Sequence, residues 1–119
     1  MSVFTGDGRF VARVDALWEY EGIVGEADGA GKYLGEFDDS GDRSGDAVAR
    51  RVIQAGVRES RLRELGFAVV RWEPGEITRR PGVVADRWLA ARARHDPSRI
   101  RARVRPEGQT AMTWYAPSR

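Results

Sequence analysis

The stretch Phe10–Asp28, FVARVDALWEYEGIVGEAD, decides the fold because it contains two strand patterns separated by a turn. Its first nine residues alternate between two faces, which predicts a single β-strand over Phe10–Trp18. Gly22 ends the turn that follows, and Ile23–Asp28 reads as a second strand. The stretch therefore predicts a β-hairpin.

Three carboxylates belong to this hairpin. Glu26 and Asp28 are two positions apart on one strand, so their side chains leave the same face of the sheet. In a hairpin centred near Gly22, Asp15 falls close to both. Two carboxylates about 7 Å apart repel by roughly 2.4 kcal/mol at an effective dielectric constant of 20. A cation or a bound proton relieves this repulsion, and ligands that are all oxygen favour Mg²⁺ or Mn²⁺.

Lys32 is the only lysine of the chain, against 19 arginines. It follows Asp28 by four positions, after glycines that allow a sharp turn. An ammonium group is a compact charge whose pKa can shift, whereas a guanidinium is a planar fork that stays protonated. Lys32 is therefore expected to orient a nucleophile or to neutralise charge beside the carboxylates. Taken singly, the three carboxylates and Lys32 are also residues that commonly occur on an exposed strand or turn.

The rest of the chain predicts a layered α/β domain. A long loop over residues 29–45 precedes a helix that ends near Leu65, with an apolar stripe that includes Ile53, Val57 and Leu62. The remaining elements are a strand over Phe67–Trp72 and a helix over residues 81–94. Residues 1–95 are expected to form the domain and residues 96–119 a basic C-terminal tail, with the isolated His95 at the surface.

Composition narrows the class of protein. The 119 residues suffice for one small domain. The absence of cysteine excludes disulfides and thiolate metal sites. No targeting or membrane-spanning pattern is found, and we therefore expect a cytoplasmic location. Residues 1–50 carry a balance of −6 and residues 51–119 a balance of +8. This asymmetry suits a cation site beside a surface for a polyanion, although a general preference for arginine would also produce a basic second half.

Several of these motifs together resemble one family. The segments ARVDALW, GIVGEADGAGKY and RESRLRELGFAVVRW occur in this order over about residues 8–90. They are similar to the very-short-patch-repair endonuclease-like domains of the PD-(D/E)XK nuclease superfamily, of the kind found in antitoxin-like regulators. The matching residues are Asp15, Glu26, Asp28, Gly29, Lys32, Arg58, Glu59, Leu62, Gly66, Phe67, Val70, Arg71 and Trp72. Two departures are Val14 in place of proline and a lysine that lies beyond the Glu-x-Asp triplet.

The resemblance implies a restriction-endonuclease-like fold, with a mixed sheet flanked by helices, and metal-dependent hydrolysis of DNA. It implies that Asp15, Glu26 and Asp28 hold Mg²⁺ or Mn²⁺ and that Lys32 assists the catalytic step. Nucleic acid is expected to contact four arginines: Arg51, Arg58, Arg61 and Arg71. Arg71 has a second interpretation, which is an ion pair with Glu59.

Two other functions stay open at the level of sequence. The first is a nuclease-like fold without catalysis that binds DNA or a partner protein in a regulator or a toxin–antitoxin type of system. The second is an interaction domain, homodimeric or with another protein, that uses Trp114 and Tyr115 as exposed aromatic contacts.

Overall fold

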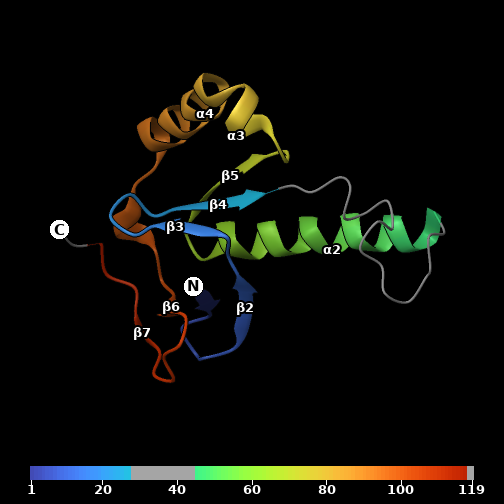
Figure 1. Cartoon of the computed structure of the whole chain (residues 1–119). Coiled ribbons are helices and arrows are strands. Elements are labelled where there is room, and N and C mark those ends of the chain that lie inside the picture. Colours follow the sequence, from blue (N-terminus) through green and yellow to red (C-terminus); the bar gives the residue numbers. More distant parts are fainter. Residues whose placement is uncertain (28–44, 118–119) are drawn as a thin grey trace.

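The turn at Gly22 organises the smaller of two sheets in the computed structural model, which describes residues 1–27 and 45–117 (Figure 1). Strand β3 (Ala16–Trp18) pairs antiparallel with β4 (Ile23–Ala27), and Leu17 lies opposite Val24. Gly22 has a φ of 68°, a conformation that glycine adopts without steric cost. The predicted hairpin is therefore present.

Helix α2 (Gly45–Glu64) connects β4 to β5 (Ala68–Trp72), which pairs parallel with β4. A parallel pair needs such a crossover, because the chain must return to the same end of the sheet. Helices α3 (Glu76–Arg79) and α4 (Pro81–Arg94) follow β5 and lie on the opposite face of this sheet from α2 (Figure 1). The described residues thus form a mixed α/β fold, as expected.

The predicted strand over Phe10–Trp18 is wrong in one respect, since the chain changes sheet in its middle. Strand β2 (Phe10–Arg13) pairs with β1 (Ser2–Phe4) in a second sheet, whereas β3 belongs to the first. At the break, the backbone N–H of Val14 donates to the carbonyl of Met1 at 3.0 Å. Alternating apolar residues predict an extended chain but do not reveal where it leaves one sheet for another.

The segment expected as a tail contributes to the core over its described part, residues 96–117. A short 3₁₀ turn, η1 (Pro97–Arg99), leads to β6 (Arg103–Arg105) and β7 (Thr113–Trp114), which complete the sheet β2-β1-β6-β7. The ring of Tyr115 packs edge-on against Phe67, with 5.3 Å between the ring centroids, and its hydroxyl donates to the carbonyl of Glu19. Of the two aromatic residues predicted to be exposed, Trp114 is exposed and Tyr115 is buried.

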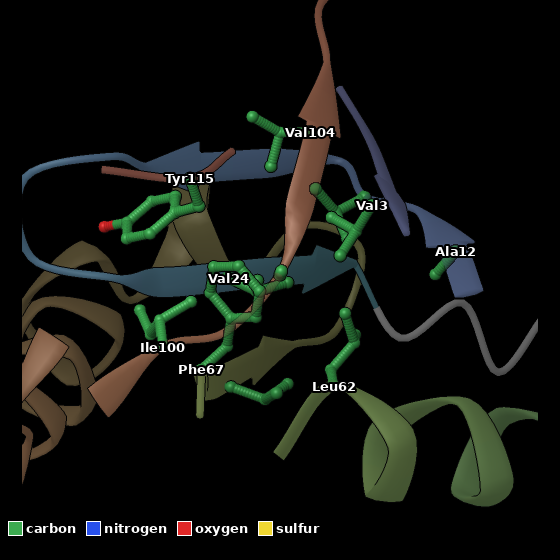
Figure 2. Close-up of a cluster of buried hydrophobic side chains, with 11 residues drawn as sticks. Val3, Ala12, Val24, Leu62, Phe67, Ile100, Val104 and Tyr115 are labelled. Atoms are coloured by element: carbon green, nitrogen blue, oxygen red, sulfur yellow. The ribbon is translucent and has the colours of Figure 1, made fainter. Parts of the chain in front are cut away.

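The core lies between the two sheets and the C-terminal end of α2 (Figure 2). Its buried side chains come from both halves of the chain: Val3, Ala12, Val14, Val24, Leu62, Phe67, Val69, Ile100, Ala102, Val104 and Tyr115. Because residues near both ends of the sequence meet in one cluster, the two sheets stabilise each other.

The predicted apolar stripe of α2 is mostly not buried. Leu62 is fully buried, but Ile53 and Val57 are 65% and 44% exposed. The cause is length, because a helix of 20 residues is about 30 Å long whereas strands of five residues span about 17 Å. The N-terminal part of α2 therefore extends beyond the sheet (Figure 1). None of the described helices combines the length and apolar character needed to cross a membrane.

The face of the sheet that carries α4 is packed with tryptophan. A Cβ atom added to Gly25 would lie 2.6 Å from the ring of Trp72 and 2.8 Å from that of Trp18. The ring of Trp18 in turn contacts Trp88 of α4, with 5.8 Å between centroids. Gly25 is thus required by the close approach of two indole rings.

Candidate functional site

The hairpin register places Asp15 beside the C-terminal end of β4. Ala16 pairs with Gly25, so the residue before Ala16 lies next to Glu26. The carboxylate of Asp15 accepts a hydrogen bond from the backbone N–H of Ala27 at 2.8 Å. This bond fixes the carboxylate of Asp15 at the end of β4. The predicted proximity of Asp15 and Glu26 is therefore confirmed.

Glu26 is the buried acidic residue of the site and is only 2% exposed. It alternates with Val24, which belongs to the core, and both face the side of the sheet that α2 covers. Burial raises the pKa of Glu26 to about 7; Arg58 opposes this shift, and the neighbouring carboxylate of Asp15 adds to it. Near neutral pH the site can therefore take up or release a proton.

Arg58 on α2 supplies the nearest positive charge without completing a hydrogen bond. Its Nε atom lies 3.8 Å from Oε1 of Glu26, which is beyond hydrogen-bonding distance. Both of these atoms are buried and have no hydrogen-bond partner among the described residues. Buried polar atoms are usually paired, and those that are not call for a functional or structural explanation.

The donors present suit a hard cation. Asp15 and Glu26 offer carboxylate oxygens at adjacent positions, and Oε1 of Glu26 has no partner within the described part of the chain. Mg²⁺ is commonly bound through one or two carboxylates with water completing its shell. Within residues 1–27 and 45–117 no group of three acidic or histidine side chains is found. The other predicted members of the site, Asp28 and Lys32, lie outside the described residues, as does Gly29.

The four arginines predicted to contact nucleic acid separate into two groups. Arg51, Arg58 and Arg61 line one groove on α2, together with apolar residues that include Val11 and Ile53. Arg58 therefore connects this groove, which we call the α2 groove, to the carboxylate site. The sequence signal for this surface was the apolar stripe of α2. Where that stripe does not pack into the core, its residues line the groove.

Arg71 lies opposite Glu26 in the pairing of β4 with β5, and its side chain is held by a structural network. Its Nε donates to Glu59 at 2.5 Å and its Nη2 donates to the carbonyl of Ala55 at 3.3 Å. Glu59 also accepts from Arg63 at 3.1 Å. The second interpretation of Arg71, an ion pair with Glu59, is therefore the one observed.

His95, expected at the surface, is half-buried instead. Its Nε2 is inaccessible and has no hydrogen-bond partner among the residues described. Burial lowers the pKa of His95. It follows α4 and lies near Gly22, at the opposite end of β4 from Glu26, so it does not belong to the carboxylate site.

Comparisons of the chain with protein-family models, with curated proteins and with solved structures found no match in any of the three. The function is therefore argued from the geometry of the carboxylate site and the α2 groove.

Proposed function

We propose that the protein is a metal-dependent nuclease that hydrolyses phosphodiester bonds of DNA on a restriction-endonuclease-like fold. One observation carries this proposal: next to Asp15 and Arg58, Glu26 buries a carboxylate oxygen that has no hydrogen-bond partner among the described residues, and Arg58 also lines the α2 groove. The order of hairpin, crossover helix and parallel strand supports the proposed fold.

Asp15 and Glu26 would hold Mg²⁺ or Mn²⁺, with Asp28 as the predicted further ligand or water-positioning group. When bound, such an ion polarises a phosphoryl oxygen and lowers the pKa of a bound water. Basic side chains of the protein would bind the substrate and assist the catalytic step. Arg51, Arg58 and Arg61 would bind backbone phosphates along the α2 groove and direct one of them toward the carboxylates. Lys32 remains a predicted participant in the catalytic step.

The position of Arg58 favours a second candidate function. A guanidinium 3.8 Å from Glu26 already supplies a positive charge where a metal ion would otherwise be needed. A protein of this kind could bind DNA, or a partner protein, through the α2 groove without cleaving a substrate. The two candidates differ in their dependence on a divalent cation.

The decisive experiment is nicking of a supercoiled plasmid in the presence of Mg²⁺ or Mn²⁺. Glu26→Gln keeps the size of the side chain and removes its charge, so we expect at least about a 100-fold loss of the nicking rate. Lys32→Ala is expected to reduce the rate as well. The matched control is Glu64→Gln, an exposed position of the same helix that carries Arg58, and it should leave the rate unchanged.

Equal nicking by the wild type and by Glu26→Gln would reveal a contaminating nuclease and would exclude the carboxylate site as the catalytic centre. Absence of nicking combined with DNA binding that survives EDTA and survives Asp15→Asn would establish the second candidate. In that case Arg58→Gln, with Arg99→Gln as an exposed control outside the groove, should weaken binding.

A further inference from the structure

Strand β5 leaves one edge open on the side away from the carboxylate site. In the described part of the chain, β5 pairs only with β4. The N–H of Ala68 donates to the carbonyl of Gly22, so Ala68 faces the inner side of the strand. In a parallel strand the inner and outer residues alternate, and the backbone groups of Val69 and Arg71 therefore point outward.

The outward carbonyls are occupied by side chains from the two flanking helices. Arg63 of α2 donates to the carbonyl of Val69 at 3.3 Å, and Arg87 of α4 donates to the carbonyl of Arg71 at 3.2 Å. Both bonds are long for N–H···O contacts, and both arginines lie at the exposed surface with about half of each side chain accessible to solvent. Each guanidinium has five donors, so it can exchange a carbonyl for a carboxylate without losing its other contacts.

A cleft runs along this open edge between α2 and α4, with a volume of about 630 Å³. Small residues, among them Gly66, Ala90 and Ala91, leave room beside the strand. The cleft is lined by four arginines: Arg63, Arg71, Arg87 and Arg94. Arg63 and Arg71 form ion pairs with Glu59, and Arg87 forms one with Glu76. Arg94 is exposed and makes no ion pair with the acidic residues of the described ranges.

We propose that this cleft binds an extended acidic peptide segment of another protein, which adds as a strand to the edge of β5. The backbone of the segment would pair with the outward groups of Val69 and Arg71. Its Asp or Glu side chains would pair with Arg94. They would also accept hydrogen bonds from Arg63 and Arg87 in place of the two long carbonyl contacts, while these arginines keep their ion pairs with Glu59 and Glu76.

The observations favour this occupant over two others. A second copy of the chain would present the same cleft, whose described lining includes no acidic residue to pair with Arg94, whereas an acidic peptide supplies one. A nucleic acid would satisfy the arginines but not the outward backbone groups of a strand, which match another peptide backbone. The cleft is also separate from the α2 groove, because the two share no lining residue.

The probe for the test is a fluorescein-labelled, acetylated nonapeptide in which Glu alternates with Val, added to the full chain and followed by fluorescence anisotropy. We expect saturable binding with a Kd below about 1 mM. Methylating alternate backbone nitrogens of the peptide removes the donors for the β5 carbonyls, so that affinity should fall by at least about tenfold. Arg94→Glu should weaken binding by about tenfold, and Arg92→Glu on the same helix but outside the cleft should not.

Three results would overturn the proposal. The first is absence of binding up to the millimolar range. The second is equal binding of the methylated peptide, which would reduce the interaction to charge alone. The third is a single-stranded oligonucleotide that binds with the same dependence on Arg94 and displaces the peptide, which would identify the cleft as a nucleic-acid surface. The methylated peptide leaves the protein unchanged, so the test does not depend on whether a variant folds.

Discussion

Gly25 and Glu26 are neighbours on β4 but belong to opposite faces of the same three-stranded sheet. On the face of Gly25, the rings of Trp18 and Trp72 fill the space that a side chain would take. On the face of Glu26, a carboxylate oxygen and the Nε of Arg58 are buried without hydrogen-bond partners in the described part of the chain. The Gly25 face is tightly packed, whereas the Glu26 face holds buried polar atoms that lack partners among the described residues.

This difference assigns separate tasks to the two faces. Packing aromatic rings against a strand stabilises the fold, since each ring removes a large apolar area from water. Leaving a buried polar atom unpaired costs about 1–3 kcal/mol, and the described residues supply no hydrogen-bond partner for Oε1 of Glu26. A ligand that supplies the missing partner would recover this free energy, which is why we expect binding on the Glu26 face and structural support on the Gly25 face.

The largest expected effect comes from filling the Gly25 face. Gly25→Ala places a methyl group 2.6–2.8 Å from rigid indole rings, which cannot move without disturbing α4. We expect the free energy of unfolding in urea to fall by about 2–3 kcal/mol. The control is Gly82→Ala on α4, where an added Cβ would meet no described atom within 4 Å, and it should not destabilise the protein. A loss below about 0.5 kcal/mol at Gly25 would mean that this face is loosely packed, and the comparison would lose its basis.

The next effect concerns the charge on Glu26. The pKa of Glu26 is about 7 in the folded protein, whereas its ordinary value is 4.5, so between these pH values the folded state holds a proton that the unfolded state has released. The free energy of unfolding should therefore fall as pH rises from 5 to 8, by about 2 kcal/mol from this group. The loss is complete about one pH unit above this pKa, because Glu26 is still half protonated at pH 7.

The variant Glu26→Gln isolates this contribution, because the glutamine has no proton to release. His95 acts in the opposite direction: burial lowers its pKa, so it favours stability as pH rises through the ordinary value of 6.5. Its contribution is common to both proteins and cancels in the difference between them. If the wild type and Glu26→Gln show the same dependence on pH, Glu26 is already ionised and paired in the folded protein.

The sequence predicted the strands and the turn around β4, but it did not predict how these elements pack with the rest of the chain. Alternation, Gly22 and the turn gave the hairpin, and the hairpin register brought Asp15 to Glu26. The pattern could not show that the strand from Phe10 breaks before Ala16. The alternation of apolar residues continues across the break, although β2 and β3 belong to different sheets. Nor could it show that the segment after residue 95 enters the core, since its many arginines hide the buried residues spaced between them.

For the site, the sequence identified residue types but not their surroundings. The spacing of Asp15 and Glu26 was informative because a strand fixes direction, whereas the burial of Glu26 depends on α2, which no local pattern places. Arg71 and Arg58 are both arginines in matching motifs, yet one is held by Glu59 and the other faces Glu26. The open edge of β5 was also missed, because strand pairing is a property of the whole sheet.

A smaller effect is expected from adding a metal ion to the Glu26 face. Mn²⁺ at ten times its Kd would stabilise the folded protein by about 1.4 kcal/mol, measured as a rise of the Tm. The rise should grow from pH 6 to pH 8, since the ion binds the ionised carboxylate, and it should disappear in Glu26→Gln. Gly25→Ala, although less stable, should keep the rise because its change lies on the other face. No rise at millimolar Mn²⁺ would favour the function without catalysis.

The smallest effect tests a second glycine whose surroundings contrast with those of Gly25. A Cβ added to Gly56 of α2 would meet no atom within 4 Å of those described, so Gly56→Ala should raise the free energy of unfolding by about 0.5–1 kcal/mol through helix propensity alone. Gly56 lies within the stretch of α2 that lines the α2 groove. A variant that is more stable but binds DNA more weakly would show that this part of α2 approaches the ligand closely. Unchanged DNA binding would place the contacts on the arginines alone.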